Sequence, residues 1–191
     1  MVKRLKEENI WNIPNTLSII RIIIALVLIY LVFAQIEIIP IVVLFAIGML
    51  TDFFDGHFAR RFKQKTEFGR KIDIIADRIL LVGVMLAIIL EFSIRGILAP
   101  ADLLNIALIM SREIISLPFA ILLLISGREI PHSRFIGKLT TFVQGIAVPI
   151  VLLSIFFDVG FSTYLAVITG IIGAVSAGYF IKDTLSEEVK R

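Results

Sequence analysis

Long apolar segments are the feature that most constrains this chain. A helix needs roughly 20 mostly apolar residues to cross a bilayer core. Hydrophobic residues make up 58% of the 191 residues and the mean hydropathy is +0.98, whereas soluble domains are about half apolar. A soluble fold of this composition would lack a polar surface, so the sequence predicts an all-α, polytopic membrane protein. The six predicted transmembrane helices are 17–33, 39–59, 69–90, 103–125, 139–157 and 164–181.

The first fifteen residues differ from the rest of the chain. They combine several charges with the single tryptophan, Trp11, and end close to Pro14. This pattern predicts a short amphipathic helix at the membrane interface, broken by the proline. We therefore expect an N-terminal interfacial segment at 1–15 and one six-helix transmembrane domain at 16–191.

The basic residues are distributed unevenly. Most of the 19 Lys and Arg residues lie in the N-terminal segment, in the connections after the second and fourth predicted spans, and in the C-terminal tail. The positive-inside rule then predicts a multi-pass protein of the cell membrane with both termini in the cytoplasm. A net charge of only +3 fits this topology better than nucleic-acid binding, and the absence of cysteine excludes thiolate metal sites.

Four aspartates lie near the cytoplasmic ends of the second and third predicted spans. Asp52 and Asp55 are three residues apart, and Asp73 and Asp77 are four apart, so each pair projects from one face of its helix. Four carboxylates converging in a medium of low dielectric repel one another unless cations compensate them. An all-oxygen ligand set favours Mg²⁺ or Mn²⁺, so the pattern predicts a divalent metal site on the cytoplasmic side.

These aspartates belong to a longer motif. The stretch from Asp52 to Arg60 reads DFFDGHFAR, and the stretch from Gly69 to Asp77 reads GRKIDIIAD. Together they resemble the signature of the CDP-alcohol phosphotransferase family, D-x2-D-G-x2-A-R-x8-G-x3-D-x3-D, at every fixed position. A motif this long has a small false-positive risk.

The resemblance implies a reaction, a cofactor and an assembly. The reaction is transfer of a phosphatidyl-type group from a CDP-lipid to a hydroxyl acceptor, with release of CMP, by a homodimer. Asp52, Asp55, Asp73 and Asp77 would hold two metal ions, and Asp77 would also be the catalytic base. The residues implied for CDP binding are Asn15, Ser18, Asp52, Gly56, Ala59, Arg60, Thr66, Gly69 and Asp73.

The acceptor is indicated by two basic residues in the second half of the chain. Arg112 lies in the middle of the fourth predicted span and Lys138 lies at the start of the fifth. We expect them to bind an anionic acceptor together. The N-terminal and fifth-span segments resemble phosphatidylglycerophosphate synthases, which implies glycerol 3-phosphate. Ile74 and Arg78 depart from that branch and leave inositol phosphate open as the acceptor. The lipid of the donor can be diacylglycerol or archaeol.

Two alternatives from other classes also place acidic residues in a membrane. An intramembrane prenyltransferase binds a diphosphate through aspartate-rich motifs, but its two motifs lie far apart in a larger bundle. A cation transporter would place its acids near the midplane and would not need the Gly-x-x-Ala-Arg element. Metal-dependent release of CMP separates the three classes.

Overall fold

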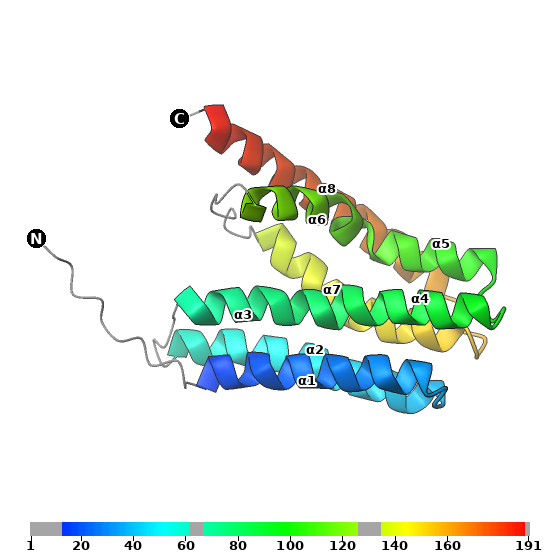
Figure 1. Ribbon diagram of the computed structural model, residues 1–191. Helices are drawn as coiled ribbons and strands as arrows, with labels where there is room; N and C mark the ends of the chain where they lie inside the picture. Colours follow the sequence, from blue (N-terminus) through cyan, green and yellow to red (C-terminus); the bar gives the residue numbers. More distant parts are fainter. Residues whose placement is uncertain (1–12, 62–66, 126–134, 190–191) are drawn as a thin grey trace, which may run out of the picture. The chain divides into compact units, whose positions relative to one another are not determined.

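The computed structural model describes residues 13–61, 67–125 and 135–189, and every element within these ranges is a helix (Figure 1). The chain divides into two units, Met1–Glu91 and Phe92–Arg191. The prediction of an all-α protein is confirmed for the part of the chain that the structure describes.

The first unit contains α1 (Ile13–Phe33), α2 (Ile38–Arg61), α3 (Glu67–Arg78), η1 (Ile79–Gly83) and most of α4 (Val84–Ile94). Helix α1 ends where Gln35 adopts a left-handed backbone conformation, with φ of 60°. The amide of Ile36 then donates to the carbonyl of Leu31 at 3.1 Å, which closes the helix as in a Schellman motif. Helix α2 begins only two residues later, so α1 and α2 lie side by side.

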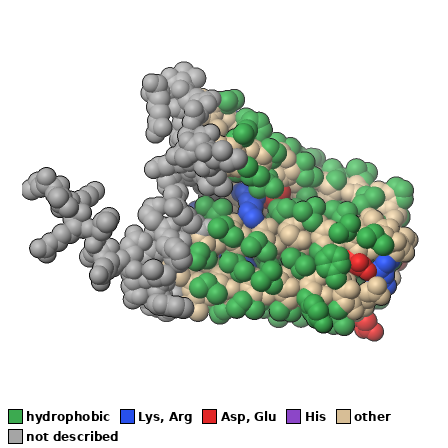
Figure 2. Space-filling model, in the orientation of Figure 1, with side chains coloured by type: hydrophobic (Ala, Val, Ile, Leu, Met, Phe, Trp, Pro, Cys, Tyr) green, Lys and Arg blue, Asp and Glu red, His purple; other side chains and the backbone are tan. Residues whose placement is uncertain are grey.

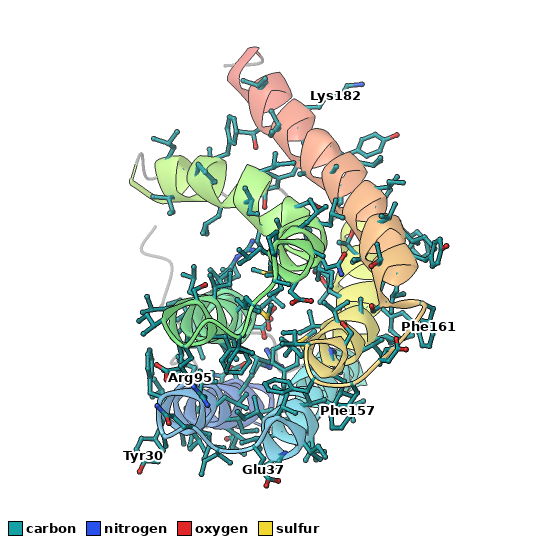
Figure 3. All side chains as sticks on the ribbon, turned by 90° about the vertical axis from the view of Figure 1, so that its right-hand side faces the viewer. Tyr30, Glu37, Arg95, Phe157, Phe161 and Lys182 are labelled. Atoms are coloured by element: carbon teal, nitrogen blue, oxygen red, sulfur yellow. The ribbon has the colours of Figure 1, made fainter. Side chains whose placement is uncertain are left out.

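One stripe of α1 forms the core of this unit. Arg21, Ala25, Leu28 and Val32 are at most 1% exposed and recur at the spacing of a single helical face. The other faces of α1 carry exposed apolar side chains, including Tyr30, which points away from the helices (Figure 3). Apolar side chains on both the inner and outer faces are expected of a helix that lies in lipid.

Helix α2 approaches its neighbours closely at Gly48. A Cβ placed there would lie 3.0 Å from Cδ1 of Leu80 and 3.3 Å from Cγ2 of Ile24. The missing side chain therefore lets α2 pack against η1 and α1 at the same point.

Helices α3, η1 and α4 follow one another without a gap from Glu67 to Ile94 and form one rod in Figure 1. The middle segment, η1, is a π-helical turn that starts two residues after Asp77. A π-helical turn shifts the angular position of the side chains that follow it, and such turns often occur beside functional sites.

The second unit contains α5 (Pro100–Ile109), α6 (Ser111–Ile125), α7 (Phe135–Ser154) and α8 (Ser162–Val189). Asp102 Oδ2 accepts the amide of Ala99 at 2.9 Å and so caps the start of α5. Helix α8 packs against α5, α6 and α7. Hydrophobic side chains are spread over the whole described surface visible in Figure 2.

Within the described residues, three helices are long and apolar enough to cross a membrane, Asn15–Phe33, Phe135–Ser154 and Ser162–Leu185. A fourth span results if α5 and α6, which are bent by 54° relative to each other, are counted together. The chain is thus a multi-pass membrane protein, and the six predicted spans stay a prediction.

Two details differ from the sequence prediction. The fourth predicted span, 103–125, is not one straight helix, because it bends at Met110 between α5 and α6. Helix α1 begins at Ile13, with Pro14 in its first turn, where proline is tolerated. Residues 1–12 of the predicted interfacial segment lie outside the described residues.

Candidate active site

Asp73 and Asp77 lie one turn apart on α3 and share one partner, Arg21 of α1. Arg21 Nη1 donates to Oδ1 of Asp73 at 3.0 Å and to Oδ1 of Asp77 at 2.6 Å. The side chain of Arg21 is fully buried, whereas those of Asp73 and Asp77 are 41% and 42% exposed. The two carboxylates are therefore fixed from the inside by a buried cation and remain accessible from the outside.

The same guanidinium also contacts α2. Arg21 Nε donates to Oγ1 of Thr51 at 3.3 Å, and Thr51 Oγ1 donates to the carbonyl of Gly48 at 2.6 Å. Thr51 directly precedes Asp52, the first aspartate of the motif. Arg21 therefore links α1 and α3 to α2 at Thr51, directly before the aspartate pair of α2.

The other predicted metal ligands are Asp52 and Asp55. The structure describes the backbone of α2 through Arg61, and it places both residues in this helix. Their side chains lie outside the description. Among the side chains that are described, no group of three acidic, histidine or cysteine residues is gathered as a metal site. The four-aspartate site thus stays a prediction.

The described part of the cluster suits a hard divalent cation. It offers carboxylate oxygens of Asp73 and Asp77, and the contacts to Arg21 use Oδ1 of each. Ser18 Oγ lies 3.5 Å from Oδ1 of Asp73, so a hydroxyl is also close. Oxygen donors on a partly exposed acidic face are the ligands that Mg²⁺ and Mn²⁺ prefer.

The residues predicted to bind CDP are described in part. Asn15 and Ser18 are 2% exposed and lie on the same face of α1 as Arg21. Gly69 is buried in the first turns of α3, four residues before Asp73. Gly56, Ala59 and Arg60 lie in α2 without described side chains, and Thr66 lies outside the described residues.

The two residues predicted to bind the acceptor both lie in the second unit. Arg112, in the first turn of α6, donates from Nη1 to Oγ1 of Thr141 at 2.8 Å. Lys138 is exposed and precedes Thr141 by three residues, so the two share one face of α7. The bend at Met110 places Arg112 in the first turn of α6, which is near the middle of the span if α5 and α6 are counted as one.

A buried polar network supports Arg112, and its central residue, Gln144, was not among the predicted site residues. Gln144 Nε2 donates to Oε2 of Glu113 at 2.7 Å and to the carbonyl of Ile109 at 2.9 Å. Glu113 Oε1 lies 4.0 Å from Nη1 of Arg112. A glutamine in the middle of an apolar run was the available signal, because a polar residue within a span needs a partner.

Arg21 was also absent from the predicted site. In the sequence it is one of three arginines within predicted spans and ends the N-terminal stretch that resembles phosphatidylglycerophosphate synthases, but nothing local ties it to the aspartates. A charged residue inside a membrane is by default a sign of function or pairing.

The described helices and the half-exposed Asp73 and Asp77 place this chain in the class of integral membrane proteins whose polar site is built from helices. The profile of the CDP-alcohol phosphatidyltransferase family matches residues 11–177, and the chain belongs to this family. It is therefore a CDP-alcohol phosphotransferase of phospholipid biosynthesis. This membership favours the transferase over the prenyltransferase and the transporter.

Three similar proteins share the name CDP-diacylglycerol–glycerol-3-phosphate 3-phosphatidyltransferase. The protein from Rickettsia typhi is 34% identical over 144 residues, which cover 74% of this chain and 76% of that protein. The protein from Bacillus subtilis is 33% identical over 159 residues, or 75% and 77% of the two chains. The protein from Salmonella typhimurium is 34% identical over 108 residues, or 55% and 56%.

Proposed function

We propose that this chain transfers the phosphatidyl group of CDP-diacylglycerol to glycerol 3-phosphate and releases CMP. The observation that carries this proposal is the similarity to relatives named for that reaction, which extends over about three quarters of the chain. The position of Arg112 beside the face of α7 that bears Lys138 supports an anionic acceptor.

We also propose that the reaction needs Mg²⁺ or Mn²⁺, held by Asp52, Asp55, Asp73 and Asp77. Two bound ions would neutralise the diphosphate of the CDP-lipid and the charge that develops as CMP leaves. The support is the described half of the site, in which Asp73 and Asp77 lie one turn apart and are both accessible.

In the proposed reaction, a carboxylate oxygen of Asp77 accepts the proton from the acceptor hydroxyl as that oxygen attacks the lipid-side phosphorus. The new bond joins the acceptor oxygen to phosphorus. The bond that breaks joins the same phosphorus to the bridging oxygen, which leaves with CMP. Arg21 fixes Asp77 through Oδ1, so the aspartate has a defined orientation toward its partners.

The acceptor is proposed to bind through its phosphate. The planar guanidinium of Arg112 can bind two phosphate oxygens at once, and Lys138 adds a second positive charge. Thr141 and Glu113 restrict the position of the Arg112 side chain before the acceptor arrives. This preorganisation lowers the entropy that binding costs.

We further propose six spans, with the active site and both termini in the cytoplasm of a cell-membrane homodimer. Helix α2 has 24 residues, and the rod of α3, η1 and α4 runs from Glu67 to Ile94, so each is long enough to cross a bilayer. Together with the three long helices and the bent pair, they bring the spans to six. The homodimer rests on the family resemblance alone.

A purified sample tested with CDP-diacylglycerol and a panel of acceptors would test the function. We expect CMP release with glycerol 3-phosphate, and its loss when EDTA removes the metal. Transfer to inositol phosphate in place of glycerol 3-phosphate would identify the other acceptor. A preference for CDP-archaeol in parallel assays would change the assigned lipid.

A further inference from the structure

The most unusual group in the first unit is the guanidinium of Arg21, because a fully buried cation in a membrane helix is costly unless it is paired. Its described partners are two carboxylates on α3 and a hydroxyl on α2. One side chain thus contacts three helices of the unit.

Arg21 contacts the aspartate motif on α3 and the residue directly before the motif on α2. Two of its partners, Asp73 and Asp77, are proposed metal ligands, and the third, Thr51, is the neighbour of another. Carboxylates placed this close repel one another, so without a cation the two side chains would move apart. Arg21 supplies one positive charge from the buried side and leaves the outer side accessible.

We propose that Arg21 is a positioning residue, an internal counter-ion that holds Asp73 and Asp77 in register while no metal is bound. This inference rests on the proposed metal site. In this role the arginine and the metal compensate the same carboxylates, one from inside the bundle and the other from the accessible side. Loss of the arginine should therefore harm the metal-free protein more than the metal-bound protein.

Thermal unfolding in detergent, with EDTA and with saturating Mg²⁺, tests this role. For Arg21→Gln we expect Tm to fall by about 5 °C or more in EDTA, because removing one partner leaves buried charge uncompensated. In Mg²⁺ the loss should be clearly smaller, so the rise in Tm that metal produces should be larger than in the parent. Mn²⁺ titration should show severalfold tighter binding to Arg21→Gln, because a neighbouring positive charge has been removed.

Three further variants separate charge from packing. Arg21→Lys keeps the charge but cannot reach Thr51, Asp73 and Asp77 together, so its Tm should fall in both conditions while the metal-induced rise stays close to that of the parent. Arg21→Gln combined with Asp77→Asn should be more stable in EDTA than Arg21→Gln alone. Arg95→Gln, at an exposed arginine outside the cluster, should behave as the parent.

Equal losses of Tm in EDTA and Mg²⁺, or weaker Mn²⁺ binding to Arg21→Gln, would overturn the counter-ion role and leave only a packing role. Failure of the proposed metal site has a different signature. In that case the parent itself would show no change of Tm with Mg²⁺ or Mn²⁺ and would release CMP in EDTA.

Discussion

Gln144 of α7 and Glu113 of α6 are joined by a 2.7 Å hydrogen bond from Nε2 to Oε2, and neither side chain is more than 3% exposed. The same nitrogen donates to the carbonyl of Ile109, next to the bend between α5 and α6. A single amide thus pairs a buried carboxylate and a carbonyl at the bend.

Gln144→Leu should therefore destabilise the protein by about 2 kcal/mol, because it removes the donor that the Glu113 carboxylate and the Ile109 carbonyl share. Ser116→Ala is the matched control. Ser116 Oγ is buried and has no hydrogen-bond partner among the described residues, so its removal should cost little. Thermal unfolding in detergent would compare the two, and equal losses would show that the network is not what stabilises the bend.

The approach of α8 to α6 can be tested at two glycines. A Cβ at Gly173 would lie 2.5 Å from Oγ of Ser111 and 3.3 Å from the amide of Arg112, whereas nothing lies within 4 Å of a Cβ at Gly178. Gly173→Ala should cost about 1–3 kcal/mol through overpacking, and Gly178→Ala should be neutral or slightly stabilising. Ser111→Ala should recover part of the loss in Gly173→Ala. Similar stabilities of the two alanine variants would contradict this packing.

Asp73→Asn should abolish CMP release while the protein still assembles in the membrane. Removing one of several clustered carboxylates relieves repulsion as it weakens metal binding. Asp158→Asn, at an exposed aspartate after α7, is the control that should keep full activity. CMP release measured across a range of Mg²⁺ concentrations gives the comparison, and normal activity of Asp73→Asn at low Mg²⁺ would reject the assignment.

Arg112→Gln and Lys138→Gln should each raise the KM for glycerol 3-phosphate and leave the KM for CDP-diacylglycerol nearly unchanged. A charge-assisted hydrogen bond to phosphate contributes about 1.5–3 kcal/mol, which corresponds to a loss of roughly ten- to a hundredfold in kcat/KM. Steady-state kinetics with both substrates varied would show this, with Arg95→Gln as the control. A variant equal to the parent toward every phosphorylated acceptor would remove the phosphate-binding role.

The orientation can be tested by cysteine labelling, since the chain has no cysteine of its own. Lys63→Cys should react with a membrane-impermeant maleimide only from the cytoplasmic side, and Gly160→Cys only from outside. The physical basis is the excess of basic residues on cytoplasmic connections. The reverse labelling pattern would overturn the proposed topology.

The sequence determined the features that depend on local pattern. Apolar run length and composition predicted helices in a membrane, and the spacing of Asp73 and Asp77 placed both on one helical face, as α3 shows. The motif also predicted the family, because its eight fixed positions lie within a single helix–connection–helix segment.

Only the tertiary structure decided which distant side chains meet. Arg21 reaches Asp77 across 56 positions of sequence, and Gln144 reaches Glu113 across 31. Such pairs depend on how neighbouring helices are rotated and how closely they pack, and those are set by contacts such as Gly48 on Leu80. The periodicity of one helix defines its faces but not the face of another helix that each will meet, so the buried counter-ion and the bend at Met110 required the assembled bundle.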